Sequence, residues 1–432
     1  MDNASVKTRK QECDYPSSKV LTALQQLLER QFSSKSFTYE LLPATEKGEN
    51  YIGIVYRVSV KLNTSCGVRL SNIILKMAPR NSTRRKQFFI RPCFLREALA
   101  YEEFLPMIEN FQRNKGLAEE YCFHEYAKCF YTSTDELEEV VFLEDLSLQE
   151  FGVFDRFDDF QFEHIATVMR TYAKLHALSF AIKDQQPKAL DKFRKIEDIF
   201  LQHKDVSNLN IYFEGLKRTA LACLEQESDK YRQILDKFFK RPFFEIFSDL
   251  IDGNKYEPYA VLCHGDCWNN NLMFKMEDTD VVTMRLLDWQ LLRYSSPISD
   301  VMYFIFTCTT RKFRKAHYGD VLNVYYEELI NHISSFLHRL GSNPFKLFPR
   351  EKFVEELKNR GAVALLFAMI VLPIITLKCE DVPNLENLSE LAEIGKLKNL
   401  KDSGLLCEGN LQEYSQRMRD VIIDCINFGY IR

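Results

Sequence analysis

Residues 259–300 constrain the fold more than any other stretch, because three short apolar runs in it lie next to isolated polar side chains. The runs have the length and composition of buried strands. Asp266 follows the first run, Asn271 directly precedes the second, and Asp288 ends the third. The pattern therefore predicts strand, loop and strand, with three oxygen-bearing side chains beside strand ends. The runs are 259–263, 272–274 and 281–287.

These three side chains match the needs of phosphoryl transfer. A carboxylate must accept the proton of the attacking hydroxyl, and hard oxygen ligands must hold the metal ions that neutralise the nucleotide phosphates. The alternative is that the three residues only cap turns at strand ends, as Asp and Asn often do. Turn chemistry does not require Asp, Asn and Asp in this order, so the set as a whole favours phosphoryl transfer.

The motif HGDxxxxN at 264–271, followed by Asp288 in DWQ, resembles the catalytic loop and metal-binding segment of aminoglycoside and choline kinases. With SSPISD at 295–300, it looks most like the insect ecdysteroid-kinase-like family. The resemblance implies that Asp266 is the catalytic base and that Asn271 and Asp288 hold Mg²⁺. It also implies an α+β, bilobal, protein-kinase-like fold, in which a lobe with a five-stranded antiparallel sheet plus a helix precedes a larger, mostly helical lobe.

Alternating apolar residues predict the strands of the first lobe, at 38–45, 51–62 and 68–77. A Gly-containing turn between strands can bring backbone amides to phosphates, and a lysine on the next strand can reach phosphate oxygens. GENY at 48–51 resembles the nucleotide-covering loop of the family, which implicates Gly48, Asn50 and Lys76 in cofactor binding. Gly53 departs from the small hydroxyl residue of many relatives. Without that context, GEN is an ordinary hairpin turn and Lys76 an ordinary edge-strand lysine.

An amphipathic segment at 86–108 predicts a helix after the third strand. In a kinase fold this helix supplies a glutamate that pairs with the lysine. FLREALAY resembles that helix, so Glu97 is the candidate, and the alternative is that Glu97 is a surface charge. We expect Glu102 and Glu103 to be solvated, and residues 84–86 to form a solvated helix start.

Two further apolar runs complete a five-stranded sheet, at 121–132 and 140–143. FLEDL, which follows directly, resembles the linker of the family. Backbone groups at such an edge commonly hold adenine, so the resemblance adds Glu144 and Leu146 to the nucleotide-binding residues. The predicted lobes are a nucleotide-binding lobe at 1–143 and a catalytic and substrate-binding lobe at 144–432.

The second lobe is predicted to be helical. Residues 162–181 carry a wide apolar stripe, and we interpret His176 within it as a buried structural histidine rather than a catalytic one. Asp300 is expected to cap the helix that it opens or to brace the catalytic loop. The basic cluster 311–315 is expected to be a solvated helix end. The uncharged run 361–377 is predicted to be a buried helix rather than a membrane span, because it is short and contains a proline.

Composition narrows the class further. A chain of 432 residues is too long for one ordinary core, and a net charge of -4 argues against a nucleic-acid-binding surface. The N-terminus lacks the apolar core of a secretory signal, so we expect a cytoplasmic protein whose 12 cysteines remain thiols. Cys263 and Cys267 flank His264, but no CxxC accompanies them, which argues against structural zinc.

The resemblance thus implies an ATP-dependent, Mg²⁺-requiring kinase that transfers the γ-phosphate to a hydroxyl of a small molecule, most simply an ecdysteroid or related steroid alcohol. A choline-like or xenobiotic alcohol is the alternative acceptor. Two other classes stay open, a pseudokinase that binds without transfer and a lipid-binding or membrane-anchored protein. We expect no nucleic-acid or membrane partner, and a monomer is favoured. Spacing does not identify the residues that line the acceptor site.

Overall fold

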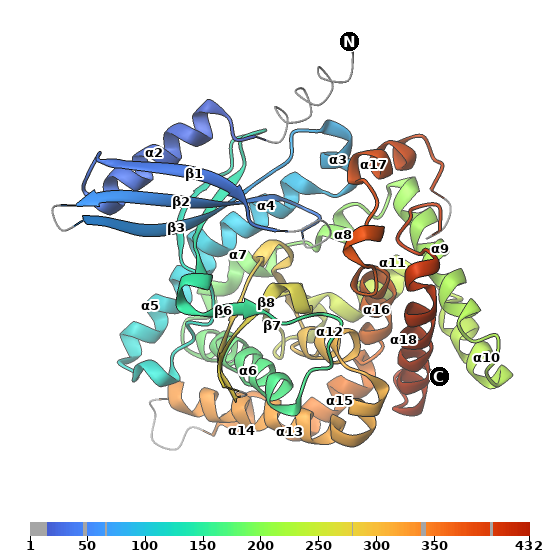
Figure 1. The fold of residues 1–432 in the computed structure, drawn as a ribbon. Helices are drawn as coiled ribbons and strands as arrows, with labels where there is room; N and C mark the ends of the chain where they lie inside the picture. The colour runs from blue at the N-terminus through green and yellow to red at the C-terminus, as the bar shows by residue number, and fades with distance from the viewer. Residues whose placement is uncertain (1–14, 46–49, 65–66, 279, 338–342, 398–400) are drawn as a thin grey trace, which may run out of the picture.

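The computed structural model describes residues 15–45, 50–64, 67–278, 280–337, 343–397 and 401–432. They form the expected bilobal α+β fold, with a five-stranded antiparallel sheet in the first lobe and helices through most of the second (Figure 1). The second lobe also holds two small sheets, of two and three strands. It is these small sheets that carry the polar segments of residues 259–300.

The sheet of the first lobe comprises β1 (Phe37–Pro43), β2 (Ile54–Thr64), β3 (Gly67–Met77), β4 (Cys129–Ser133) and β5 (Val140–Glu144), in the order β1-β2-β3-β5-β4. Side chains alternate between the two faces of a strand, so each strand presents one apolar face. Helix α2 (Ser18–Phe32) covers one of the faces with its buried valine and leucines (Figure 1). The five predicted strands are therefore confirmed, although the fourth begins later than residue 121.

The prediction of one continuous helix at 86–108 is wrong, because the chain forms several helical segments there. The structure has α3 (Ser82–Gln87), α4 (Ile90–Leu99), a π-helical turn (Ala100–Phe104) and α5 (Leu105–Lys115). Phe89, between α3 and α4, has a φ of 52°, in the left-handed region. A right-handed helix cannot continue through that conformation, so the chain turns before it enters the helix that carries Glu97.

Two basic clusters that were predicted to be solvated are partly buried. The guanidinium of Arg85 lies 2.6 Å from the carboxylate of the buried Glu139. Arg314 is 2% exposed and pairs with Asp424 at 2.8 Å. Each paired carboxylate lies far along the chain, so a local run of charges does not reveal it.

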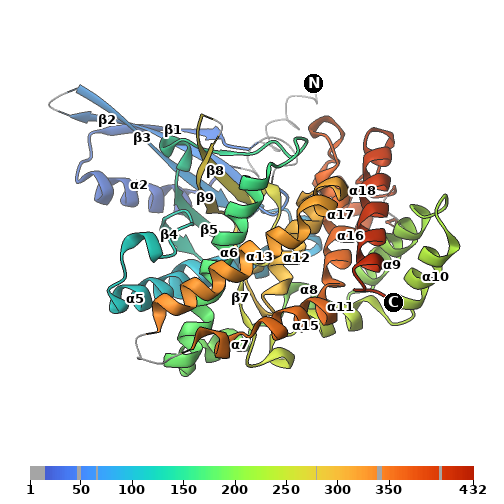
Figure 2. The same ribbon diagram turned by 90° about the horizontal axis from the view of Figure 1, so that it is seen from below.

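The centre of the second lobe is the pair of long helices α6 (Phe162–Gln185) and α13 (Arg311–Phe336), which pack against each other (Figure 2). Helices α12 (Ile298–Cys308), α16 (Val363–Ile375) and α18 (Glu408–Asn427) extend this core. The shorter helices are α7 (Asp191–Arg194), α8 (Ile199–Gln202), α9 (Ser207–Ala222), α10 (Asp229–Phe238), α11 (Phe243–Ile251), α14 (Pro344–Leu347), α15 (Arg350–Arg360) and α17 (Leu385–Glu393).

The small sheets position the loops of the second lobe. One pairs β7 (Val261–Cys263) with β10 (Arg293–Ser295), and the other has the order β6-β8-β9, with β6 (Phe151–Val153), β8 (Leu272–Glu277) and β9 (Asp280–Leu286). The predicted strand, loop and strand arrangement is therefore confirmed. Short 3₁₀ helices lie at Glu119–Tyr121, Leu146–Gln149, Pro187–Leu190, Gly253–Tyr256, Asn269–Asn271, Trp289–Leu291 and Cys379–Asp381.

The apolar run 361–377 forms α16, nearly all of whose residues are buried, as predicted. Within the described ranges, no single helix is long and apolar enough to cross a membrane. In the same ranges, one bent pair of helices, Pro344–Arg360 and Val363–Ile375 at an angle of 56°, is together long and apolar enough. Every cysteine in the described part of the chain is free.

Candidate active site

The loop between β7 and β8 is shaped by Gly265. Its φ is +88°, and a Cβ atom on it would lie 2.0 Å from the carbonyl oxygen of Leu291. Only glycine tolerates both the backbone conformation and this close approach. The loop that carries Asp266 therefore packs directly against the segment that follows Asp288.

Three side chains hold the buried carboxylate of Asp266. Asn271 Nδ2 donates to its Oδ2 at 2.8 Å, and Gln290 Nε2 donates to the same oxygen at 3.4 Å. Tyr303 donates its hydroxyl proton to Oδ1 at 3.1 Å. A carboxylate fixed by three donors presents its remaining lone pairs in one direction, as a general base requires.

The pKa of Asp266 is higher than that of an exposed aspartate. Burial and the nearby Asp288 carboxylate raise its pKa, and His264, Tyr303 and Gln290 oppose that rise. Burial lowers the pKa of His264. The histidine accepts from the Asp266 amide through Nδ1 at 3.3 Å and contacts the Leu287 carbonyl through Nε2 at 2.8 Å, which fits one neutral tautomer.

Asp300 braces the loop from beneath. Its Oδ2 accepts from the backbone amide of His264 at 2.7 Å and its Oδ1 from that of Gly265 at 3.1 Å. His176, which is fully buried, lies 3.3 Å from the same carboxylate and 2.8 Å from the Tyr325 hydroxyl. Burial would raise the pKa of Asp300, but the contacts from His176 and His264 outweigh it and lower the pKa. The predicted burial of His176 is confirmed.

Lys76 connects the two lobes. Its ammonium lies 2.8 Å from Glu97 Oε2 and also bonds to Asp288 Oδ1. Burial disfavours the charge on Lys76, but Asp288 and Glu97 together raise its pKa, so the lysine stays protonated. Burial raises the pKa of Glu97 to about 7, against the attraction of Lys76. The structure thus brings together Lys76, Glu97 and Asp288, all of which the sequence singled out.

The donor set fits a divalent cation. Glu97 and Asp288 share the single ammonium of Lys76, and the Asp288 carboxylate also lies close enough to the buried Asp266 to raise its pKa. The excess negative charge is what a bound cation would offset. The side-chain amide nitrogen of Asn271 donates to Asp266, which leaves the side-chain amide oxygen for a cation. The backbone carbonyl of Asn271 accepts from the backbone amide of Leu287 at 2.9 Å, which places Asn271 close to Asp288.

The predicted nucleotide-covering turn is described only in part, because Gly48 lies outside the described residues. Asn50 Oδ1 accepts from the amides of Ile52 and Gly53, at 3.1 and 2.7 Å, and so fixes the turn. A Cβ on Gly53 would lie 3.2 Å from Cγ of Lys76. The absence of a side chain at this position thus makes room for the stem of the lysine.

The linker residues are engaged within the protein. Glu144 accepts from the Lys128 amide at 2.7 Å and from Gln149 at 2.9 Å, while Leu146 is 3% exposed and belongs to the core. Both side chains thus already have partners within the protein. The nucleotide-binding role assigned to Glu144 and Leu146 stays a prediction.

A cavity of about 710 Å³ opens beside Asp266. Asn271, Asp288 and Tyr303 also lie on its wall, whereas Lys76 and the linker do not. Most of the remaining lining is apolar and comes from the first lobe, the segment around α8, and helices α16 and α17. Representative members are Phe89, Phe200, Leu209, Phe367, Ile374 and Leu388.

Sequence reasoning missed Tyr303, Gln290 and almost the whole cavity. Gln290 belongs to the DWQ motif itself. Tyr303 lies three residues after Asp300 in α12, so about one helical turn places Tyr303 on the same side of the helix as Asp300. That spacing is the only local signal for Tyr303. The apolar lining carries no signal, because the same residues are ordinary core residues by pattern.

The model of the ecdysteroid kinase-like family matches residues 47–337 of the chain. No curated protein matches it significantly. Among solved structures, a GDP complex of a mutant aminoglycoside 2'-phosphotransferase-IIIa is 10% identical, with a TM-score of 0.40, over 94% of this chain and 98% of its own. The wild-type GDP complex is 12% identical, with a TM-score of 0.40, over 88% and 99%. An aminoglycoside-3'-phosphotransferase of type VIII is 12% identical, with a TM-score of 0.31, over 78% and 97%.

Proposed function

The chain belongs to the ecdysteroid kinase-like family, and on that premise we propose that it is an ATP-dependent kinase of an apolar small-molecule alcohol, most simply a steroid. The observation that carries the proposal is the position of Asp266. Its oriented carboxylate forms the polar floor of a mostly apolar cavity of about 710 Å³. Pockets of 300 to 1,000 Å³ or so hold drug-sized ligands.

In this proposal Asp266 accepts the proton of the acceptor hydroxyl as the γ-phosphoryl group is attacked. Asn271, Gln290 and Tyr303 hold the carboxylate so that its free lone pairs face the cavity. General-base catalysis contributes about 100- to 10,000-fold to such reactions. Positioning the hydroxyl against the base contributes separately, by converting the encounter into a unimolecular step.

Lys76 would contact the phosphate oxygens of the nucleotide, and Glu97 would keep the ammonium in place. Asn271 and Asp288 would hold Mg²⁺ with their side-chain oxygens. A bound Mg²⁺ neutralises charge on the phosphates. Because Lys76 already bonds to Asp288, nucleotide binding requires the lysine to exchange that contact for a phosphate oxygen.

The lining of the cavity supports an uncharged acceptor over a cationic one. Among the described residues that line it, the only carboxylates are Asp266 and Asp288, and both have assigned roles. An acceptor with several ammonium groups would need further carboxylates to bind its charge, whereas the quaternary ammonium of a choline-like acceptor can also bind to aromatic faces, so choline stays the alternative. A xenobiotic alcohol of steroid size is the second candidate, since an apolar wall distinguishes such molecules only by shape. We further propose that the protein acts as a cytoplasmic monomer.

The proposal is tested by following transfer of radiolabelled γ-phosphate from ATP to a panel of ecdysteroids, sterols, phenols and choline. We expect transfer to apolar alcohols and none to choline, with dependence on Mg²⁺. Calorimetry on the same folded sample measures ATP binding. Binding of ATP without transfer to any member of the panel would instead support a pseudokinase, and failure to bind ATP would refute the enzyme.

A further inference from the structure

Arg293, the first residue of β10, is a buried arginine whose guanidinium contacts the loop that carries Asp266. It is 2% exposed. Its Nη2 donates to the carbonyl of Gly265 at 3.1 Å, and its Nε lies 3.4 Å from the carbonyl of Leu291. Both contacts are to backbone next to residues that the proposed chemistry uses. Arg293 therefore fixes the path of the loop that carries Asp266.

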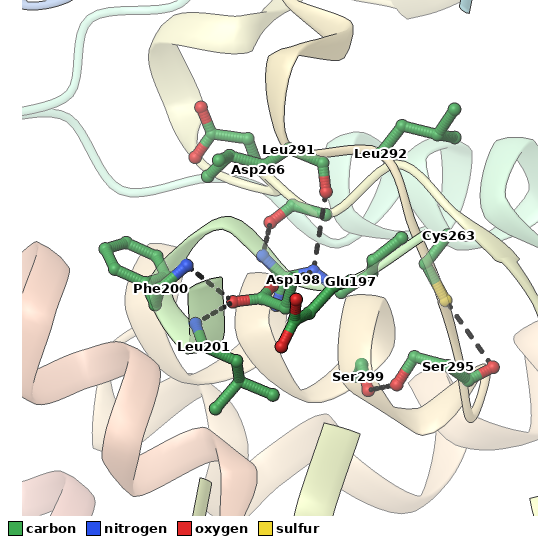
Figure 3. Close-up of polar contacts among 12 residues, drawn as sticks. Glu197, Asp198, Phe200, Leu201, Cys263, Asp266, Leu291, Leu292, Ser295 and Ser299 are labelled. Atoms are coloured by element: carbon green, nitrogen blue, oxygen red, sulfur yellow. Dashed lines mark hydrogen bonds and ion pairs between the residues drawn. The ribbon is translucent and has the colours of Figure 1, made fainter. Parts of the chain in front are cut away.

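The same guanidinium pairs with Asp198, which precedes α8. Asp198 is 8% exposed, and its Oδ2 lies 3.4 Å from Nε of Arg293. Its Oδ1 accepts from the backbone amides of Phe200 and Leu201, at 2.9 and 3.4 Å, and so caps α8. Figure 3 shows the Asp198 carboxylate pointing at these two amides, below the Leu291 carbonyl. One carboxylate thus joins the catalytic loop to the first turn of α8.

A second arginine ties this junction to the first lobe. Arg96, next to Glu97 on α4, donates to the carbonyl of Leu292 at 2.6 Å and to that of Glu197 at 2.8 Å. Glu197, the residue before Asp198, is therefore bonded to α4, the helix that carries Glu97. The start of α8 is fixed from both lobes.

The elements joined in this way form walls of the acceptor cavity. Phe200 of α8 lines it, and so does Phe367 of α16, whose ring lies 5.1 Å from the guanidinium of Arg293. Phe367 in turn stacks on Tyr303, with ring centroids 4.4 Å apart, and Tyr303 donates to Asp266. The α16 wall is thus connected to Asp266 through Phe367 and Tyr303, and the α8 wall is connected to the Asp266 loop through the Asp198–Arg293 pair.

Stability alone is a weak reason for such a pair. A buried ion pair loses about as much in desolvation as it gains, and apolar residues of similar size often serve as well. What an arginine adds is a planar fork that fixes several acceptors at once. Here those acceptors are the catalytic loop and the cap of a cavity wall.

We propose that Asp198 and Arg293 are positioning residues that hold the α8 wall of the acceptor cavity in register with the catalytic loop. The wall then places the acceptor hydroxyl against Asp266. Water, which attacks ATP in the competing hydrolysis, needs no wall to position it, so hydrolysis depends less on the pair. The inference rests on the proposed kinase function. It predicts that the pair affects transfer to the acceptor more than hydrolysis of ATP.

The test is Asp198→Asn, which keeps the side-chain volume and an oxygen to cap α8 but removes the charge that faces Arg293. We expect the KM for the acceptor to rise about 10- to 100-fold, the range that misplacement of a reacting group produces. The ratio of transfer to ATP hydrolysis should fall with it. The KM for ATP should change less than about threefold, a split that general destabilisation does not produce.

Asp252→Asn is the matched control. Asp252 also caps a short helix, through an acceptor bond from the Asn254 amide at 3.0 Å, and lies outside the acceptor cavity. It should leave transfer and hydrolysis unchanged. In a double-mutant cycle, the effects of Arg293→Lys and Asp198→Asn on transfer to the acceptor should be less than additive, because both disturb the same ion pair. Arg293→Lys alone should have the larger effect, since it also loses the bond to the Gly265 carbonyl.

A binding measurement separates this inference from the proposed function. Trp268 lines the cavity, so quenching of its fluorescence by ecdysone reports acceptor binding without turnover. We expect Asp198→Asn to weaken ecdysone binding about tenfold or more while ATP binding by calorimetry persists. Unchanged ecdysone binding and acceptor KM, or an equal loss of transfer and hydrolysis, would overturn the positioning role. A wild type that binds ecdysone but transfers nothing would overturn only the kinase function.

Discussion

The two sides of Asp266 are built in different ways. On the nucleotide side, Lys76, Glu97 and Asp288 are joined by short ion pairs, and their positions depend on directional bonds. On the acceptor side, apolar side chains from Tyr51 to Leu405 form the wall, and their positions depend on packing. A side chain that makes a directional bond cannot be replaced without losing that bond, whereas an apolar side chain of a packed wall can be replaced by another with a change in the shape of the cavity.

The family match covers the nucleotide side fully and the cavity wall only in part. It ends at residue 337, so it includes every charged group named in the chemistry. Helices α16 and α17, which supply Phe367, Ile374 and Leu388 to the cavity, come after it. The charged groups thus lie within the family match, whereas part of the cavity wall belongs to a segment outside it. Substitutions on the two sides should have different consequences.

Asp266→Asn should have the largest effect, because it removes the proposed base from the boundary between the two sides. We expect phosphoryl transfer to fall about 100- to 10,000-fold, the usual contribution of a general base. ATP affinity should stay within a few-fold, since Asp266 faces the cavity. Steady-state kinetics and calorimetry provide both values. Near wild-type transfer would remove Asp266 from the base role.

Asp288→Ala should come next and should act chiefly on the nucleotide side, although Asp288 also lines the cavity. We expect the strengthening of ATP binding by Mg²⁺ to be lost, by about 10-fold or more, because an oxygen ligand and the partner of Lys76 both disappear. Calorimetry with Mg²⁺ and with EDTA measures the difference. Binding of an ecdysteroid in the cavity, followed by Trp268 fluorescence, serves as the control and should persist. Equal strengthening by Mg²⁺ in the variant and the wild type would exclude Asp288 as a ligand.

Ile370→Ala should act on the acceptor side alone and more weakly. Ile370 is half-buried on the cavity wall, so its truncation enlarges the cavity instead of opening a hole in the core. We expect the preference among steroids, as a ratio of kcat/KM values, to shift about 10-fold toward bulkier acceptors. The KM for ATP should not change. A preference identical to that of the wild type would mean that this wall does not contact the acceptor.

His176→Ala should have the smallest effect on turnover. The histidine supports Asp300 from outside the site, and Asp300 keeps its bonds to the loop amides without it. We expect a loss of about 1 to 3 kcal/mol in the free energy of unfolding, from the unpaired Asp300 and Tyr325 groups, with transfer within a few-fold. Denaturant unfolding and a transfer assay measure the two. Loss of turnover with unchanged stability would make the histidine part of the catalytic machinery.

Local pattern was sufficient for the strands and for the polar residues beside their ends. Asp266 and Asn271 lie five residues apart in one loop, so the local course of the chain is enough to bring them together. Pattern failed where a partner lies far along the chain. Arg85 and Arg314 resemble solvated charges until Glu139 and Asp424 are placed beside them.

By itself, the sequence determined the order of strands and helices and the set of charged groups available for phosphoryl transfer, because periodicity and short spacings depend only on neighbouring residues. The tertiary structure alone decided the acceptor cavity, the Tyr303 bond to Asp266 and the Asp198–Arg293 pair. Each of these joins residues that are tens to hundreds of positions apart. Contacts of that kind arise from packing of whole elements, and no local run of residues encodes them.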